Sequence, residues 1–263
     1  MANIIEKTDI VYDAAHNLAL DLYYDEDHDA QGTLIDIHGG GWFRGDKAKD
    51  RDWALRLVND GFTVVVPNYR ITPNGYYPDP LIDMDHVVDW IHSSKLTQEP
   101  IGAVGSSAGG NMTVELGLKY GFPIVSLSGV FDIDDWLASH QDVVAKQDVT
   151  QDFVHAASSA IDQTGTNDSF YKWFVTNYFN GHTDQYTAAT PYKHVTASAG
   201  PMYLANSLNE FVPTTGLVSL VSALNKVQVP TISRFLPGSR HAKGYLDEVY
   251  DETVDFLKLN VND

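Results

Sequence analysis

One stretch of the sequence decides the fold of this chain: Ile101-Gly102-Ala103-Val104-Gly105-Ser106-Ser107-Ala108-Gly109-Gly110. A short apolar run ends in a G-x-S-x-G pattern with Ser107 at its centre, and an apolar segment with helical potential follows over residues 111–119. A strand, a sharp turn and a helix in this order form the turn on which a nucleophilic serine is exposed. The turn needs glycine two residues to either side of Ser107, because side chains there would collide with the neighbouring strand and helix.

Length and charge restrict the protein class. The chain has 263 residues and a net charge of −18, which suits one α/β domain, with or without an insertion, whose surface repels nucleic acid and anionic membranes. Its cysteine count of 0 excludes disulfides, thiolate catalysis and cysteine-bound metals. Residues 1–10 show no signal peptide, and no apolar run reaches the ~18 residues needed to span a membrane. We therefore expect a cytoplasmic protein.

Strand and helix patterns alternate along most of the chain. Residues 4–12 and 18–24 alternate apolar with polar side chains, which predicts two antiparallel strands at a sheet edge. Further strands are predicted at 33–37, 62–67, 123–130, 201–205 and 229–236, and helices at 50–59, 80–93, 111–119, 213–225 and 245–259. This alternation predicts a mostly parallel central sheet with helices on both faces.

The alternation stops between residues 131 and 190. This part of the chain is helical or loop-like and rich in aromatic residues. We interpret it as a cap-like insertion over the carboxyl edge of the sheet, within a single domain of residues 1–263. Its aromatic side chains either line an acyl or aryl pocket or form a core of the insertion itself.

A glycine-rich motif follows the predicted strand at 33–37. His38-Gly39-Gly40-Gly41 matches the H-G-G-G pattern that supplies backbone N–H groups to an oxyanion hole. Three glycines allow several amides to point at one position without interference from a Cβ atom. His38 itself is expected to brace this loop rather than take part in chemistry.

The general base is expected to be a histidine on a late loop. His241 follows the last predicted strand through Pro237-Gly238-Ser239-Arg240 and precedes the final predicted helix. This position agrees with the order serine, acid, histidine along the chain. His194 precedes the penultimate strand, and His86 and His92 lie on a predicted helix, so these three are interpreted as ordinary surface or core histidines.

Together these motifs resemble the α/β-hydrolase superfamily, in the branch of H-G-G-G esterases. That branch includes hormone-sensitive-lipase-like carboxylesterases and esterases similar to feruloyl esterases and kynurenine formamidases. The resemblance extends over nearly the whole chain. It includes His38–Trp42, Asn68-Tyr69-Arg70, Pro78…Asp83…Trp90, residues 105–109, Ser128-Gly129-Val130-Phe131-Asp132, Thr190-Pro191, Val212-Pro213 and Pro237-Gly238…His241. The resemblance implies the α/β-hydrolase fold and an oxyanion hole formed by the amides of Gly40, Gly41 and Ala108.

The acid of the catalytic triad is the point at which the chain departs from the family. The family usually has an aspartate three residues before the valine of the Val-Pro pair, and this chain has Asn209 there. Glu210 is the carboxylate of that loop and is our first choice. Asn209 as a neutral hydrogen-bonding partner, and Asp132 with its neighbours Asp134 and Asp135, remain open alternatives.

These residues predict a serine hydrolase that cleaves small carboxylic esters with short acyl or aryl groups. Ser107 would be the nucleophile, His241 the general base and Glu210 the acid, and the acyl group would pass through Ser107. An amidase or arylformamidase of the same fold, and a catalytically silent binding protein, are the alternatives. No pattern predicts a metal or cofactor site, and a homo-oligomer is left open.

Overall fold

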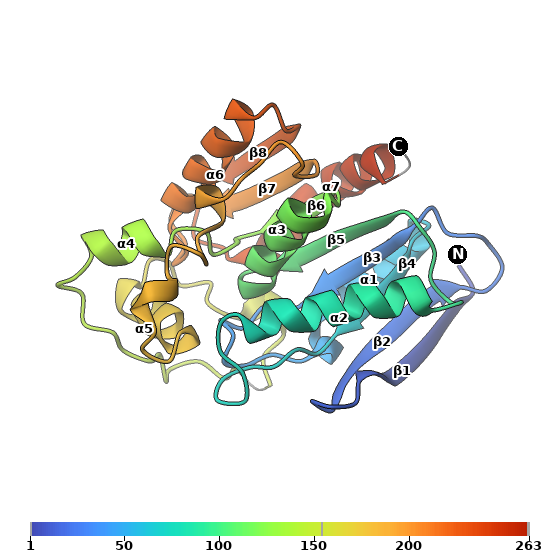
Figure 1. Cartoon of the computed structure of the whole chain (residues 1–263), viewed down its shortest axis with the longest axis horizontal. Helices are drawn as coiled ribbons and strands as arrows, with labels where there is room; N and C mark the ends of the chain where they lie inside the picture. The colour runs from blue at the N-terminus through green and yellow to red at the C-terminus, as the bar shows by residue number, and fades with distance from the viewer. Residues whose placement is uncertain (1, 154, 262–263) are drawn as a thin grey trace.

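The computed structural model describes residues 2–153 and 155–261, which contain an eight-stranded sheet with the order β1-β2-β4-β3-β5-β6-β7-β8 (Figure 1). β1 pairs with β2 and β2 pairs with β4 in antiparallel fashion, and all the other neighbours are parallel. This confirms the predicted, mostly parallel sheet with an antiparallel edge. The strands are β1 (Ile4–Asp13), β2 (Leu18–Asp25), β3 (Thr33–Ile37), β4 (Thr63–Pro67), β5 (Ile101–Ser106), β6 (Ile124–Leu127), β7 (Met202–Ser207) and β8 (Thr231–Leu236).

Helices cover both faces of the sheet because successive strand residues point to opposite faces. In β4, Val65 packs into the core under the helices drawn in front of the sheet in Figure 1, whereas Val64 and Val66 pack into the core behind it. The front helices are α2 (Asp79–Ser93), α3 (Ala108–Tyr120) and α6 (Thr214–Lys226), and those behind are α1 (Arg51–Asn59) and α7 (Leu246–Asn260). Short 3-10 turns, η1 (Lys47–Asp50) and η5 (Ala242–Tyr245), precede the two rear helices.

The segment between β6 and β7 lies beyond one end of the sheet, opposite the chain termini (Figure 1). It contains α4 (Asp134–Ser139), η2 (Ser158–Ala160), α5 (Asp168–Tyr178), η3 (Thr183–Gln185) and η4 (Pro191–Lys193). Aromatic side chains of α5 pack against the loops that follow β3 and β7. Tyr178 stacks on Trp42 with ring centroids 4.1 Å apart, and Phe170 and Phe174 lie against Phe211.

β6 is shorter than predicted. The sequence suggested a strand over 123–130, but pairing stops at Leu127 because Ser128 adopts a left-handed backbone conformation with φ 52°. This turn moves the chain out of the sheet and directs the Ser128 hydroxyl towards the loop after β7.

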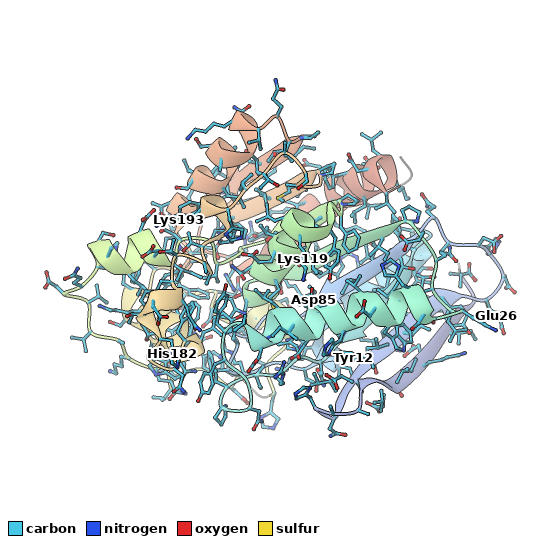
Figure 2. All side chains as sticks on the ribbon, viewed as in Figure 1. Tyr12, Glu26, Asp85, Lys119, His182 and Lys193 are labelled. Atoms are coloured by element: carbon cyan, nitrogen blue, oxygen red, sulfur yellow. The ribbon has the colours of Figure 1, made fainter. Side chains whose placement is uncertain are left out.

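Surface ion pairs connect neighbouring helices. Asp85 on α2 and Lys119 on α3, both labelled in Figure 2, form an ion pair of 2.7 Å. Such exposed pairs contribute little to stability, so the helices are held mainly by their buried apolar faces. In residues 2–153 and 155–261, no helix has the combination of length and apolar composition that crossing a bilayer requires.

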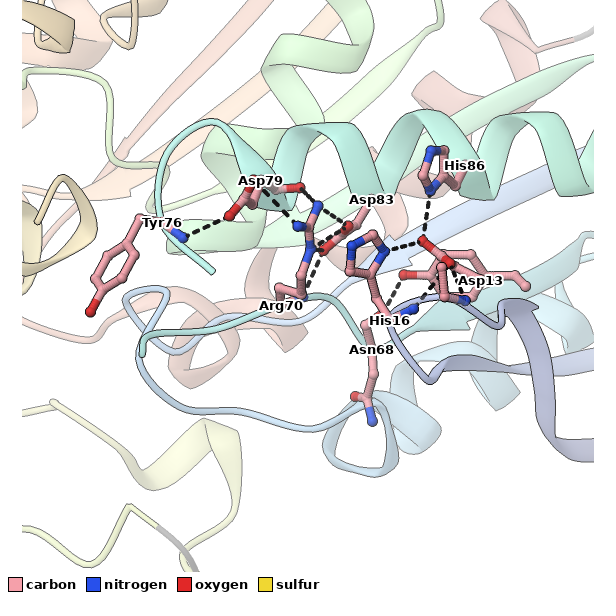
Figure 3. Close-up of polar contacts among 10 residues, drawn as sticks. Asp13, His16, Asn68, Arg70, Tyr76, Asp79, Asp83 and His86 are labelled. Atoms are coloured by element: carbon pink, nitrogen blue, oxygen red, sulfur yellow. Dashed lines mark hydrogen bonds and ion pairs between the residues drawn. The ribbon is translucent and has the colours of Figure 1, made fainter. Parts of the chain in front are cut away.

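The first hairpin is fastened to α2 through Asp13 (Figure 3). Oδ2 of Asp13 accepts hydrogen bonds from Nδ1 of His16 at 2.8 Å and from Nδ1 of His86 on α2 at 2.9 Å, and Oδ1 accepts the Ala15 and His16 amides. Beside it, Arg70 binds the fully buried carboxylate of Asp83 at 2.7 Å. The charged groups of this cluster therefore satisfy one another.

Asp13→Asn is expected to destabilise the protein by about 1–3 kcal/mol at neutral pH, because the amide retains one acceptor and opposes the histidine donors. The hydrogen bond from His16 holds the pKa of Asp13 below its ordinary value. The stabilisation is therefore present above the unfolded-state pKa of about 3.9 and is lost as pH falls through the lower folded-state pKa. Urea unfolding of both proteins between neutral and acidic pH should show the difference shrinking in acid, and a pH-independent difference would contradict this account.

Candidate active site

Ser107 lies at the sharp turn between β5 and α3. Its backbone angles are φ 55° and ψ −120°, a region that residues with a Cβ atom rarely occupy. The turn is held in place because the Ser107 amide donates to the Leu127 carbonyl at 2.8 Å, and the Ser107 carbonyl accepts the Asn111 amide at 3.1 Å. The strain therefore lies at the residue that the sequence identifies as the nucleophile.

The two flanking glycines have the steric role expected of them. A Cβ atom on Gly109 would lie 1.9 Å from the Ile37 carbonyl oxygen of β3, and one on Gly105 would lie 2.3 Å from Oγ1 of Thr113 on α3. Neither contact is possible with a side chain present. Glycine at both positions allows the turn to fit between its neighbouring strand and its own helix.

One pocket unites several of the predicted site residues. Gly40, Gly41, Ser107 and His241 all line it, although they come from loops after three different strands. Aromatic rings of Phe43, Phe153, Phe170, Phe174 and Phe211 form much of the remaining wall. Including its open mouth, the pocket contains about 590 Å³ of space not filled by atoms. Apolar rings beside a few convergent polar groups are typical of a site that binds a small molecule.

The imidazole of His241 is held by Glu210. Nδ1 of His241 forms a short hydrogen bond with Oε2 of Glu210, and both side chains are almost fully buried. Oε1 of Glu210 accepts two further hydrogen bonds of 2.8 Å each, from the Ser207 amide and from the Ser128 hydroxyl. The carboxylate is thus fixed at one end while its other oxygen faces the histidine ring.

The other candidates for the acid lie elsewhere. Asn209 is exposed, and its backbone amide donates to the Gly238 carbonyl at 3.0 Å. The carboxylate of Asp132 accepts hydrogen bonds from the Trp136 amide at 2.9 Å and from the Tyr192 hydroxyl at 3.0 Å. Asp134 and Asp135 form ion pairs with Lys193.

The glycine loop after β3 has a backbone conformation that suits an oxyanion hole, because two of its glycines adopt positive φ angles. Gly40 and Gly41 have positive φ angles of 129° and 58°, and a Cβ atom on Gly40 would lie 2.1 Å from the Arg44 carbonyl oxygen. Ala108 is the first residue of α3, a position whose N–H has no acceptor within its own helix. The three amides therefore belong to segments that border the Ser107 turn.

His38 braces this loop from behind. Its Nδ1 donates to the Gly39 carbonyl at 2.7 Å, and its ring stacks on Tyr69 with centroids 4.3 Å apart. Burial lowers the pKa of His38, which favours the neutral ring. These contacts agree with the structural role that the sequence suggests.

Asp162 places a carboxylate in the pocket wall. Asp162, from the segment between β6 and β7, forms an ion pair of 2.9 Å with Arg44. Burial raises the pKa of Asp162, and the opposing influences of His241 and Arg44 act to lower it. No sequence motif marks this pair, which brings the segment after β6 into contact with the loop after β3.

Two further residues that contact the His241 loop were missed by sequence reasoning. Ser128 lies in the Ser-Gly-Val-Phe-Asp stretch on which the family resemblance partly rests, so a signal was present without a role. Its hydroxyl accepts the Ala242 amide at 2.8 Å. Gln163 binds the backbone of His241 from a stretch with no recognisable motif.

One group of side chains has the composition of a metal site. The ligand atoms of Asp13, Asp83 and His86 lie within 4.8 Å of one another. However, Arg70 binds Asp83, and His86 donates to Asp13. Because each carboxylate already has a cationic or hydrogen-bonding partner, we assign the group the structural role described above.

A family model and two curated proteins that are hydrolases by name match this chain. A family model described as BD-FAE matches residues 20–224. "Probable carboxylic ester hydrolase LipM" from Mycobacterium tuberculosis is 26% identical over 235 residues, which cover 85% of this chain and 52% of LipM. "Putative acetyl-hydrolase LipR" from the same organism is 34% identical over 88 residues, which cover 33% of this chain and 29% of LipR. The chain thus spans about half the length of LipM and less of LipR.

Solved structures resemble the chain over nearly its whole length. Esterase B from Lactobacillus rhamnosis matches with a TM-score of 0.72 and 17% identity, covering 98% of this chain and 87% of that one. An esterase from the bacterial hormone-sensitive lipase family matches with a TM-score of 0.73 and 16% identity, covering 98% and 85%. At such identities the likeness shows the fold, and it confirms the predicted α/β-hydrolase fold.

Proposed function

Because this chain belongs to the BD-FAE family, we propose that it is a carboxylic ester hydrolase that acts through an acyl-serine intermediate. The family match and the LipM relative support the resemblance to esterases of the α/β-hydrolase superfamily, and the likeness to the hormone-sensitive-lipase-family esterase supports the fold. We further propose Ser107 as the nucleophile, His241 as the general base and Glu210 as the acid.

The observation that carries the proposal is the shared pocket, which a strained serine, a carboxylate-bound histidine and the glycine loop line together. Each part has a distinct chemical use. The carboxylate fixes the tautomer in which Nδ1 bears the proton, so that Nε2 is free to accept one. The loop supplies amides for a developing oxyanion.

In the first half of the reaction, Oγ of Ser107 attacks the ester carbonyl carbon while Nε2 of His241 takes the hydroxyl proton. The carbonyl oxygen becomes an oxyanion, which the amides of Gly40, Gly41 and Ala108 stabilise. When the tetrahedral intermediate collapses, the bond to the alcohol oxygen breaks, and the alcohol leaves with the proton from His241.

In the second half, water replaces the alcohol. His241 removes a proton from water as it attacks the acyl carbon, the same amides hold the second oxyanion, and Ser107 leaves with the proton. The products are a carboxylic acid and regenerated enzyme. The imidazolium that forms twice in this cycle is stabilised by the buried Glu210 carboxylate.

The aromatic wall of the pocket supports a substrate with a short acyl or an aryl group, since such groups bury apolar surface against phenylalanine rings. We also propose that residues 131–190 are a cap-like insertion of a single domain, 1–263. Phe153, Asp162, Phe170 and Phe174 support this, because all four line the pocket. Residues 1, 154, 262 and 263 of that proposed domain lie outside the described ranges.

A panel of chromogenic esters with acyl chains of increasing length, assayed beside an aryl amide and a formyl amide, tests this function. We expect turnover of the short acyl or aryl esters, a decline as the chain outgrows the pocket, and much weaker cleavage of both amides. Preferred cleavage of the formyl amide would instead indicate an arylformamidase. Binding without turnover of any compound would indicate a silent hydrolase-fold protein.

A further inference from the structure

We infer that Gln163, which belongs to the segment between β6 and β7, is a positioning residue for His241 and links that segment to the general base. The inference rests on the proposed function, because it assigns Gln163 a part in the same reaction. Gln163 lies 78 residues before His241 in the sequence and is partly buried against it.

The side-chain amide of Gln163 forms hydrogen bonds with both backbone groups of His241, its N–H and its carbonyl. Its Oε1 accepts the His241 amide at 2.9 Å, and its Nε2 donates to the His241 carbonyl at 3.1 Å. The second hydrogen of Nε2 goes to the Ile161 carbonyl at 2.6 Å. Only this orientation of the amide matches every donor with an acceptor, so the arrangement is fixed in direction as well as in place.

Gly244, which has no side chain, leaves space for the Gln163 amide. A Cβ atom on Gly244 would lie 2.1 Å from Oε1 of Gln163, and its next two nearest atoms would also belong to Gln163, at 2.6 and 2.8 Å. The φ angle of Gly244 is not positive, so the backbone itself does not require glycine. The side chain of Gln163 is therefore the contact that most directly opposes a larger residue at this position.

The segment around Gln163 also contacts the residues that follow the glycine loop. Its neighbour Asp162 binds Arg44 at 2.9 Å, and Nζ of Lys49 donates to the carbonyls of Phe153 at 2.8 Å and Ala156 at 3.0 Å. The same segment thus contributes to the pocket wall and holds the base.

His241 must be placed accurately, because proton transfer requires hydrogen-bond distance to Ser107. A displacement of about 1 Å of such a group reduces the rate roughly 10²-fold. Ser128 holds the next residue through the Ala242 amide at 2.8 Å. Two consecutive residues, His241 and Ala242, are therefore held by two different parts of the chain. Gln163 belongs to the inserted segment, and Ser128 follows the end of β6.

Gln163→Met, which keeps the length of the side chain and removes its hydrogen bonds, is the decisive variant. We expect kcat to fall about 10²-fold with little change in KM, because the base moves while the pocket wall stays. The NMR resonance of the proton between His241 and Glu210 should shift or broaden, which reports on the ring without substrate. Gln141→Met, an exposed glutamine of the same segment, is the matched control and should behave as wild type.

Gly244→Ala provides a second route to the same displacement and should also lower kcat. If Gln163 mediates the effect, the double variant Gln163→Ala/Gly244→Ala should be no slower than Gln163→Ala alone. Additive losses, wild-type kcat in Gln163→Met, or a rise in KM at constant kcat would each overturn the inference. Wild-type protein without esterase turnover would contradict the proposed function instead, and the His241 resonance in Gln163→Met would still decide this inference.

Discussion

Ser107→Ala is expected to reduce ester hydrolysis by roughly 10⁶-fold in kcat while leaving the protein folded. The pocket and its amides remain in this variant, but no acyl-enzyme can form. Because the Ser107 side chain makes no capping hydrogen bond to α3, the midpoint of thermal unfolding should stay close to that of wild type. Hydrolysis of the preferred chromogenic ester and a thermal melt measure the two quantities.

A serine-directed organophosphate separates the candidate nucleophiles. It should label Ser107 in the wild-type protein, and Ser107→Ala should remain unlabelled. Ser106 is the neighbouring hydroxyl in the same pocket and is the natural competitor. Labelling of Ser106, or full activity in Ser107→Ala, would show that the nucleophile has been assigned to the wrong serine.

The Ser107 turn could be predicted from sequence because a short motif marks it, with glycine two residues to either side of the serine. The structural reasons differ, since Gly105 leaves room for Thr113 of the following helix and Gly109 leaves room for the Ile37 carbonyl of β3, a distant part of the chain. The order of strands and helices followed from apolar periodicity, which is also written in short stretches of sequence. β6 ended early because Ser128 turns towards a partner 82 residues away, and periodicity does not record such a contact.

The sequence left Asn209 and Glu210 unresolved because they are adjacent residues in one loop. Which of the two faces inward depends on how the loop closes. The Asn209 amide binds the Gly238 carbonyl, and the Ser207 amide binds Glu210, so closure is set by the strand end and by the loop after β8. Gln163 is the extreme case, since its position depends on an irregular segment with no periodic pattern at all.

Glu210→Gln is expected to lower kcat by about four orders of magnitude, as loss of the same charge does in a serine protease. Oε1 of Glu210 accepts hydrogen bonds from both the Ser207 amide and the Ser128 hydroxyl, so the oxygen of a glutamine must occupy that position. Its NH₂ group then faces Nδ1 of His241. That nitrogen must become the acceptor, the proton moves to Nε2, and the imidazole can no longer accept the Ser107 proton.

Asn209→Ala is the matched comparison, because the exposed neighbouring side chain should be dispensable, and kcat should remain close to wild type. Steady-state kinetics and thermal melts of both variants measure the contrast, with both proteins expected to fold. Near-normal kcat in Glu210→Gln together with a large loss in Asn209→Ala would make asparagine the partner of His241. If neither variant loses activity, the charge behind the base comes from another residue, and Asp132→Asn becomes the deciding substitution.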